Sequence, residues 1–239
     1  MKKFILKSIA ILLTIADKTP EKNLKKGFEL NKEEITLKDD GFHGAGFRPF
    51  TEWWYFDASF KNKYSVSMAV RIIGLLKLHI CIQRMDIYKE GKRICSKRNL
   101  FFPNNFSTSK TKPLIKIDGK KVMEGLIDKK GRWNHKLSFK IDNISANLKF
   151  NGTTKGWKSK VPGSMWNVIL PSAKVTGDIQ IDNKKINVEG IGYHDHNWNV
   201  RPSTILNLRG WFWGRFNSKN FIVIWSDVVH SKDFSTLIF

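Results

Sequence analysis

The feature that most constrains this chain is a series of short apolar runs, rich in β-branched and aromatic residues, which turn-forming residues interrupt about every ten residues. After residue 40, no stretch of the sequence keeps its apolar residues at the helical period of about 3.6 over three turns. Strands at this spacing are typical of a β-sandwich or a β-barrel. We therefore predict an all-β fold with strands at Glu52–Ser59, Tyr64–Ile73, Leu78–Tyr88, Ile94–Phe102, Leu137–Ile141, Ser145–Phe150, Met165–Leu170, Ala173–Ile181, Lys185–Gly190, Gly210–Phe216 and Phe221–Val229.

The sequence divides into three parts. Residues 1–40 form a polar, lysine-rich lead, residues 41–205 contain most of the predicted strands and form a first β-domain, and residues 206–239 begin a second domain. Because the chain reaches its last residue soon after two strands of that second domain, we expect the second domain to be incomplete. Hairpin turns are predicted at Asp118-Gly119, Asn151-Gly152 and Asp182-Asn183, since these dipeptides are typical of tight turns.

The N-terminus has two interpretations. Three lysines within the first seven residues precede the apolar stretch Ile9–Ala16, and Thr14–Ala16 resembles a cleavage site with small residues. This pattern is that of a weak signal peptide, but it also fits an amphipathic surface segment or an ordinary first helix. The apolar stretch is too short to span a bilayer. A cytoplasmic location or a location at the membrane periphery is favoured.

The formal net charge of +21 bears on the partners of the chain. A basic chain can bind nucleic acid or an anionic membrane. Here the lysines are spread over the whole length, arginine is scarcer, and the sequence contains no zinc-finger spacing, RNP motif or helix-turn-helix pattern. We therefore interpret the lysines first as a solvated surface, do not expect nucleic acid as a partner, and keep peripheral membrane association as an alternative.

A glutamate stands inside an aromatic strand in the segment Arg48–Asp57. Alternate residues of a strand share a face, which places Glu52 with Trp54 and Phe56 and, on the opposite face, Trp53 with Tyr55 and Asp57. A carboxylate beside two aromatic rings is costly to bury in its ionised form. Glu52 is therefore expected either to have a raised pKa or to cap the strand or form an ion pair at its start.

A run of polar residues, Tyr193–Asn197, lies between Gly-Ile-Gly and Trp198 at the predicted end of a strand. In extended geometry His194 and His196 share one face, and Tyr193, Asp195 and Asn197 share the other. One face then offers an acid with a hydrogen-bond partner, and the other offers two imidazoles suited to proton transfer near neutral pH. A purely structural polar network is the alternative. Zinc or iron is a further one, but no third ligand follows at a convincing spacing, so we expect no metal.

A third cluster, Trp211–Phe216, places Trp211, Trp213 and Arg215 on one face of a strand. Arg215 is expected either to stack on the tryptophans or to pair with Asp195. Ordinary core packing is the alternative interpretation of this cluster.

Four segments occur in a fixed order: Glu52–Phe56, Pro171–Gly177, Gly192–Trp198 and Trp211–Phe216. In this order they resemble the carotenoid 1,2-hydratase (hydroxyneurosporene synthase) family, with its relatives kievitone hydratase, the AttH-like proteins and certain fungal Diels–Alderases. The resemblance runs from about Phe47 to Val229, and its most specific part is the string Tyr-His-Asp-His-Asn-Trp. One departure is Asn199, since the family has Trp-Gly at the end of this string.

The resemblance implies a lipocalin-like (calycin-type) antiparallel β-barrel or sandwich, followed here by the start of a second barrel. It also implies an apolar ligand in or between the barrels and catalysis without a metal or an organic cofactor. The catalytic candidates are then Asp195, His194, His196 and Tyr193. The candidates for contact with the substrate are Glu52, Trp53, Trp54, Tyr55, Asn197, Trp198, Trp211, Trp213 and Arg215.

The first functional hypothesis is a cofactor-independent hydro-lyase, which protonates an isoprenoid or carotenoid-type alkene and adds water. An apolar surrounding would raise the pKa of Asp195 and keep it protonated, and aromatic faces would stabilise a carbocation. The alternative is a non-catalytic, lipocalin-like protein that binds or carries a lipid in the same site. Both hypotheses share the partner, an apolar small molecule.

Overall fold

The computed structural model describes residues 29–31, 33–44, 46, 48–75, 78–161, 164–201, 205, 208–230 and 236–238. The predicted all-β, lipocalin-like fold is confirmed. Period-two alternation of apolar and polar residues produces it: in the strand Trp133–Ile141, for example, every second residue is buried and the residues between are not.

The main sheet contains thirteen strands. They are β1 (Glu29–Asn31), β2 (Phe50–Phe60), β3 (Tyr64–Leu75), β4 (Leu78–Lys89), β5 (Lys92–Phe101), β6 (Phe106–Thr108), β7 (Leu114–Ile117), β8 (Lys120–Ile127), β9 (Trp133–Ile141), β10 (Ile144–Gly152), β11 (Trp157–Val161), β12 (Ser164–Ile181) and β13 (Lys184–Val200). A smaller sheet contains β14 (Leu208–Asn217), β15 (Ile222–His230) and β16 (Thr236–Ile238).

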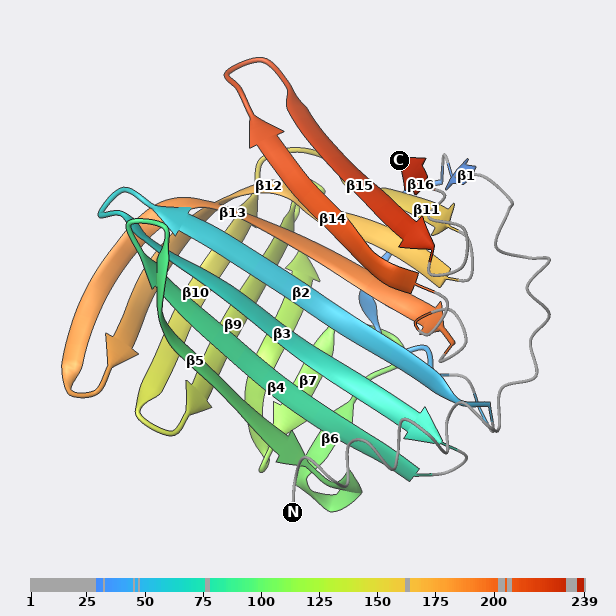
Figure 1. The fold of residues 1–239 in the computed structure, drawn as a ribbon, viewed down its shortest axis with the longest axis horizontal. Helices are drawn as coiled ribbons and strands as arrows, with labels where there is room; N and C mark the ends of the chain where they lie inside the picture. Colours follow the sequence, from blue (N-terminus) through green and yellow to red (C-terminus); the bar gives the residue numbers. More distant parts are fainter. Residues whose placement is uncertain are drawn as a thin grey trace.

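Eleven of the strands form one antiparallel path in the order β5-β4-β3-β2-β13-β12-β10-β9-β8-β7-β6. The path curls into a nearly closed barrel (Figure 1), and β4 and β5 approach β9 across its interior. The short 3-10 helix η3 (Pro103–Asn105) connects β5 to β6, which are the two ends of the path. The pairing of β2 with β13 joins the two longest motifs of the sequence, although more than 130 residues separate His194 from its partner Phe56.

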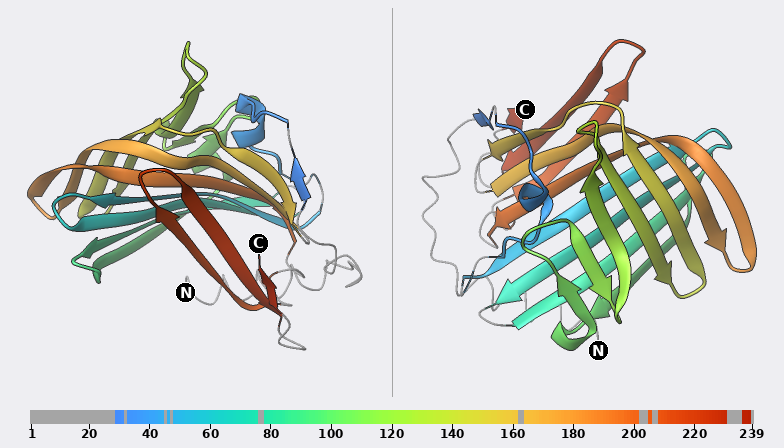
Figure 2. Two further views of the ribbon diagram at one scale, coloured as in Figure 1. Left: turned by 90° about the horizontal axis from the view of Figure 1, so that it is seen from above. Right: turned by 180° about the vertical axis from the view of Figure 1, so that it is seen from behind.

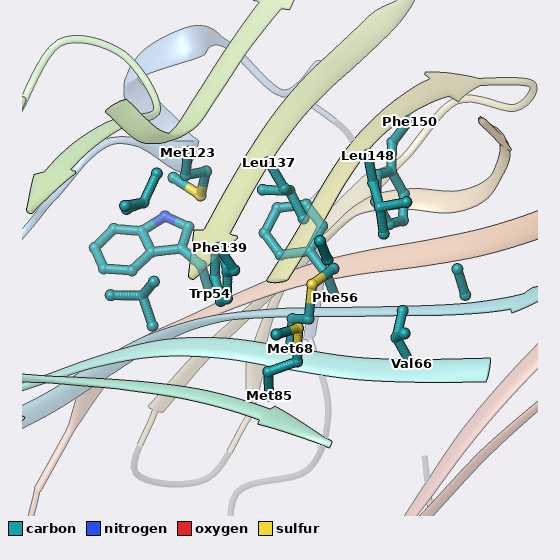
Figure 3. Close-up of a cluster of buried hydrophobic side chains, with 14 of the residues drawn as sticks. Trp54, Phe56, Val66, Met68, Met85, Met123, Leu137, Phe139, Leu148 and Phe150 are labelled. Carbon is teal, nitrogen blue, oxygen red and sulfur yellow. The ribbon is translucent and has the colours of Figure 1, made fainter. Parts of the chain in front are cut away.

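Large apolar side chains fill the interior of this barrel. Figure 3 shows the centre of the cluster, where Trp54 and Phe56 of β2 lie with Met68, Phe139 and Phe150 from three other strands. All five are at most 1% exposed. At about 25 cal/mol per Å² of apolar surface removed from water, such a cluster supplies the main favourable term for the fold.

The smaller sheet lies across the outside of the barrel, over β2, β12 and β13, as both views in Figure 2 show. Its hairpin β14–β15 turns one face toward the barrel and leaves the other face in solvent. Phe212, Phe216, Val223 and Trp225 are all more than 40% exposed. The interpretation of the Trp211–Phe216 cluster as ordinary core is therefore wrong for Trp211, Phe212 and Phe216, whereas Trp213 packs against a buried cluster.

Two of the three predicted hairpin turns are confirmed, at Asp118-Gly119 and Asp182-Asn183. The third is wrong, because Asn151 and Gly152 pair with Lys174 and Ala173 inside the β10–β12 ladder. Strand β12 also continues through Pro171, where the sequence predicted two strands, with irregular pairing on either side of this residue. Strands β1, β6, β7, β8, β11 and β16 were not predicted.

The segment before the barrel contributes to it. The 3-10 helix η2 (Leu37–Asp40) lies inside one end of the barrel, where Asp40 is fully buried. The stretch Ile9–Ala16, which resembles a signal peptide, lies outside the described residues. Within the described ranges, no helix has the length and apolar character needed to cross a membrane.

Candidate functional site

The polar string of β13 presents two different sets of side chains on the two faces of the sheet. As predicted from the alternation, Tyr193, Asp195 and Asn197 lie on the outer face, and His194 and His196 point into the barrel. The string lies inside β13 and pairs with both β2 and β12, rather than standing at the end of a strand. The catalytic candidates are thus divided between two separate environments.

On the outer face, Asp195 is held by three donors. Its Oδ2 accepts hydrogen bonds from Trp166 Nε1 at 2.9 Å and from Tyr193 Oη at 2.8 Å, and its Oδ1 accepts one from Asn197 Nδ2 at 3.1 Å. Burial raises the pKa of Asp195 to about 6, against the opposing effect of the Trp166 and Tyr193 hydrogen bonds. The pKa of Tyr193 is raised well above its usual value by burial and by Asp195, so the phenol stays a donor.

The smaller sheet covers this acid with aromatic and charged groups. The Trp213 ring lies 4.9 Å from the Tyr193 ring and 5.7 Å from the Tyr55 ring. Arg215 forms an ion pair with Asp57, not with Asp195 as the sequence suggested, and its guanidinium carbon lies 5.8 Å from the centre of the Tyr193 ring. Burial raises the pKa of Asp57, and Arg215 opposes that shift.

Inside the barrel, His194 belongs to a buried network centred on Asp40. Asp40 Oδ2 lies 2.7 Å from His135 Nε2 and 3.2 Å from His194 Nε2, and both imidazoles are completely buried. His194 Nδ1 lies 2.9 Å from the carbonyl oxygen of Tyr55. Burial raises the pKa of Asp40, but the two histidines outweigh burial and hold it well below its usual range. Burial lowers the pKa of His135.

Glu52 forms the centre of a second group at the same end of the barrel. Its carboxylate accepts hydrogen bonds from the backbone N–H groups of His43 and Gly44, and its Oε1 lies 2.9 Å from His196 Nε2. Burial raises the pKa of Glu52, but His196 and His43 lower it further, to about 2. The expectation of a raised pKa is therefore wrong, and the alternative, a partner for Glu52 at the start of the strand, agrees with its contacts to His196 and His43.

The other predicted contact residues are also divided between the two faces. Trp54 lies inside, where its Nε1 donates to the backbone oxygen of Asp40 at 2.9 Å, and Trp198 is stacked on His43. On the outer face, Trp53 packs under Arg71 at 5.1 Å. Trp211 is 54% exposed. Tyr55, Trp213 and Arg215 thus lie beside Asp195, whereas Trp54 and Trp198 do not.

Asn199 follows the polar string with φ at 56°, in the left-handed region. Glycine adopts this conformation most readily, and asparagine is among the residues that tolerate it. Asn199 thus has a backbone conformation that suits the glycine found at this position in the family that the sequence resembles.

Among the residues that the structure describes, two groups of three side chains have the geometry to hold a metal ion. They are Asp40 with His135 and His194, and Glu52 with His43 and His196, and in each group the potential ligand atoms lie within 4.8 Å of one another. Sequence reasoning missed Asp40, His43 and His135. A usable signal existed for His135, because it continues the inward alternation of Trp133 and Leu137.

The likeness to solved structures supports the same fold. An AttH candidate from Nitrosomonas europaea aligns with a TM-score of 0.67 and 15% identity, over 86% of this chain and 68% of that chain. The chain has an AttH-like fold. CghA aligns with a TM-score of 0.57 and 11% identity, over 89% of this chain and 67% of that chain, and its complex with Sch210972 aligns with a TM-score of 0.55. No protein-family model and no curated protein sequence matches the chain.

Proposed function

We propose that this protein is a hydratase-like enzyme that adds water to an alkene of an apolar isoprenoid or carotenoid-type molecule, with Asp195 as the proton donor. The observation that carries the proposal is the environment of Asp195. Its carboxyl group is buried on the outer face of β13, its pKa is raised to about 6, and three donors fix its orientation. An acid with a pKa near the working pH is suited to general acid catalysis.

The hydrogen bonds indicate which oxygen carries the proton. Oδ2 already accepts from both Trp166 and Tyr193, whereas Oδ1 accepts only from Asn197. The acidic proton therefore resides on Oδ1. In the proposed reaction this proton and the π electrons of the alkene form the new C–H bond, which leaves a tertiary carbocation. Water then forms the C–O bond, and the proton that it releases returns to the Asp195 carboxylate.

The aromatic groups around Asp195 are suited to the cationic intermediate. The rings of Tyr55, Tyr193 and Trp213 lie with their centres 4.9 to 6.4 Å apart on the same side of the sheet. An electron-rich ring face attracts a cation, by about 0.5 to 2 kcal/mol per contact. Because the pKa of Tyr193 is raised, its phenol does not compete with Asp195 as the acid.

The inward direction of His194 and His196 changes their role in the proposal. Both side chains are fully buried within the barrel and hydrogen-bonded there to Asp40 and Glu52. We therefore propose that they position β13 and do not transfer protons to the substrate. Large side chains fill the barrel interior (Figure 3). The outer face is therefore favoured over the interior as the ligand site. A carrier that encloses its lipid in the barrel is disfavoured for the same reason.

The test is water addition followed by mass spectrometry. An acyclic carotenoid is incubated with the protein in heavy-oxygen water, and the products are compared for wild type, Asp195→Asn and Glu189→Gln. Glu189 lies on the same strand but is exposed and pairs with Lys61, so its replacement is a matched control. We expect each product molecule to contain one labelled oxygen with wild type and with Glu189→Gln. With Asp195→Asn, the rate of product formation should fall by at least about 100-fold. A carotenoid that is bound but unchanged by wild type would contradict the proposal and favour a carrier.

A further inference from the structure

We propose that His43, Glu52 and His196 form a binding site for a divalent transition-metal ion of the zinc type at one end of the barrel. The site is independent of the proposed chemistry at Asp195, because it lies on the opposite face of the main sheet. Two imidazoles and one carboxylate are a donor set that zinc uses in proteins, with a fourth position left for water.

The three ligand atoms converge without rearrangement of the backbone. Glu52 Oε1 lies 3.5 Å from His43 Nδ1 and 2.9 Å from His196 Nε2. Ligand bonds of about 2.0 to 2.2 Å in a tetrahedral zinc site place neighbouring ligand atoms slightly more than 3 Å apart. The distance from Glu52 to His43 already fits such a site, the contact between Glu52 and His196 must lengthen slightly, and all three ligand atoms lie within 4.8 Å of one another.

The outer contacts of each ligand fit a metal site as well. His196 Nδ1 lies 3.3 Å from the backbone oxygen of Asp39, so Nδ1 keeps a proton and Nε2 points to Glu52. The second carboxylate oxygen of Glu52 accepts the backbone N–H of Gly44 at 2.8 Å, which fixes the direction of the carboxylate. Such outer hydrogen bonds are a regular feature of metal-binding histidines and carboxylates.

His43 supplies the observation that an ion pair alone leaves unexplained. Its Nδ1 is buried, aims at Glu52, and makes no hydrogen bond within the described part of the chain. The ring is held in this direction by stacking on Trp198, at 3.8 Å between ring centres and 2° between planes. A buried ring nitrogen without a partner is unfavourable, and a metal ion would give it one.

Access distinguishes this group from the second candidate group. The His43 side chain is 19% exposed, so this group reaches the surface through one of its members, whereas Asp40, His135 and His194 are all completely buried. His135 Nδ1 also finds no partner among the described residues that would fix its tautomer when Nε2 binds a metal. The group around Glu52 is therefore the better metal site of the two.

Metal binding would replace the contact between His196 and Glu52. In the metal-free protein, the carboxylate of Glu52 faces His196 Nε2 and the carbonyl of Asp39 faces Nδ1. A metal ion on Nε2 would take the place of the contact with Glu52, and metal sites in general release protons on binding. The ion would tie the loop that carries His43 to strands β2 and β13.

The experiment measures binding of Zn²⁺ and Co²⁺ to the full chain after removal of adventitious metal with a chelator. Calorimetry should show one saturable site and release of a proton, and Co²⁺ should show the visible absorption of a four-coordinate nitrogen and oxygen site. His43→Phe keeps the stacking on Trp198 but removes the ligand atom, and should weaken binding by about 100-fold or more. His79→Phe is the matched control, because His79 already packs edge-on against Phe42 and Phe50 and belongs to neither group.

The outcomes separate a site from adventitious binding. Equal affinity of wild type and His79→Phe, together with the loss in His43→Phe, supports the site. Absence of a saturable site in wild type overturns the proposal, and so does unchanged affinity in His43→Phe. The spectrum and the proton release are measured on wild type, so the test remains decisive if a variant folds poorly. Neither readout depends on hydratase activity.

Discussion

Asp195 and His194 are neighbours in β13, but their side chains contact different parts of the molecule on opposite faces of the main sheet. Asp195 Oδ2 accepts the Tyr193 hydroxyl at 2.8 Å on the outer face, and His194 Nε2 lies 3.2 Å from Asp40 inside the barrel. A mutation at one residue therefore removes no hydrogen bond of the other, and the charge effect of His194, which lowers the pKa of Asp195, is what still connects them.

The first prediction concerns this separation. His194→Gln leaves the buried Asp40 carboxylate with less positive charge, and breaking a buried ion pair of this kind costs about 3 to 5 kcal/mol. Asp195→Asn keeps an acceptor for Trp166 and Tyr193 and should change the free energy of unfolding by less than about 1 kcal/mol. Urea unfolding of the two variants measures both values. Equal losses of stability would show that the two faces are not independent.

The second prediction is the pH dependence of water addition. Catalysis requires the protonated form of Asp195, whose pKa burial raises to about 6. The rate should be level below that pH and should fall about tenfold per pH unit above it. The profile of kcat/KM against pH measures this directly. A rate that stays constant through neutral pH would mean that another group donates the proton.

The sequence predicted which side chains of the central strands share a face, but it did not predict all the residues that these side chains contact. Alternation alone placed Glu52, Trp54 and Phe56 on one face, and it placed His194 and His196 opposite Asp195, because the period of a strand is independent of its neighbours. Alternation could not show that the side chains on the two faces have separate hydrogen-bond partners. The sequence hypothesis therefore combined histidines and aspartate in one site.

The partners that were missed come from distant segments. Asp40 lies in a stretch that was interpreted as a polar lead, yet Ile35 in that stretch is buried, and such isolated apolar residues were the available signal. His43 lies in a loop whose path depends on tertiary contacts. Of the two alternatives for Glu52, the raised pKa was wrong for the same reason: burial was foreseen, but His43 and His196, which outweigh burial, could not be assigned as its partners.

The third prediction concerns acid stability. Glu52 has a pKa of about 2 when folded, below its usual value of 4.5, so its contribution to stability is complete above 4.5 and is lost as the pH falls toward 2. The shift corresponds to about 3 kcal/mol. Glu52→Gln should therefore be less stable than wild type at neutral pH, and its stability should fall less steeply on acidification. Unfolding by urea at a series of pH values tests this against Glu34→Gln, an exposed control. Equal pH dependence in both variants would contradict it.

The fourth prediction concerns the attachment of the smaller sheet. Arg215 is the partner of the partly buried Asp57, so Arg215→Met leaves a carboxylate that is costly to keep ionised. We expect faster hydrogen exchange in β14 and β15, with little change in the barrel strands. Asp57→Asn in the same chain removes the unpaired charge and should slow the exchange again. Uniformly faster exchange in β9 and β10 would show that the pair stabilises the whole fold instead.

The fifth prediction uses the space around a glycine of β8. A Cβ atom at Gly125 would lie 2.5 Å from His135 Nε2 and 2.5 Å from Pro113 Cγ. Because His135 Nε2 is also 2.7 Å from Asp40, Gly125→Ala must displace the imidazole from its carboxylate. Forcing a methyl group into a packed interior costs about 1 to 3 kcal/mol. Gly210→Ala is the control, since nothing described lies within 4 Å of its Cβ position. Urea unfolding should therefore show a loss for Gly125→Ala alone. Equal stability of the two variants would mean that the strand yields at this point and that His135 is not fixed by close packing.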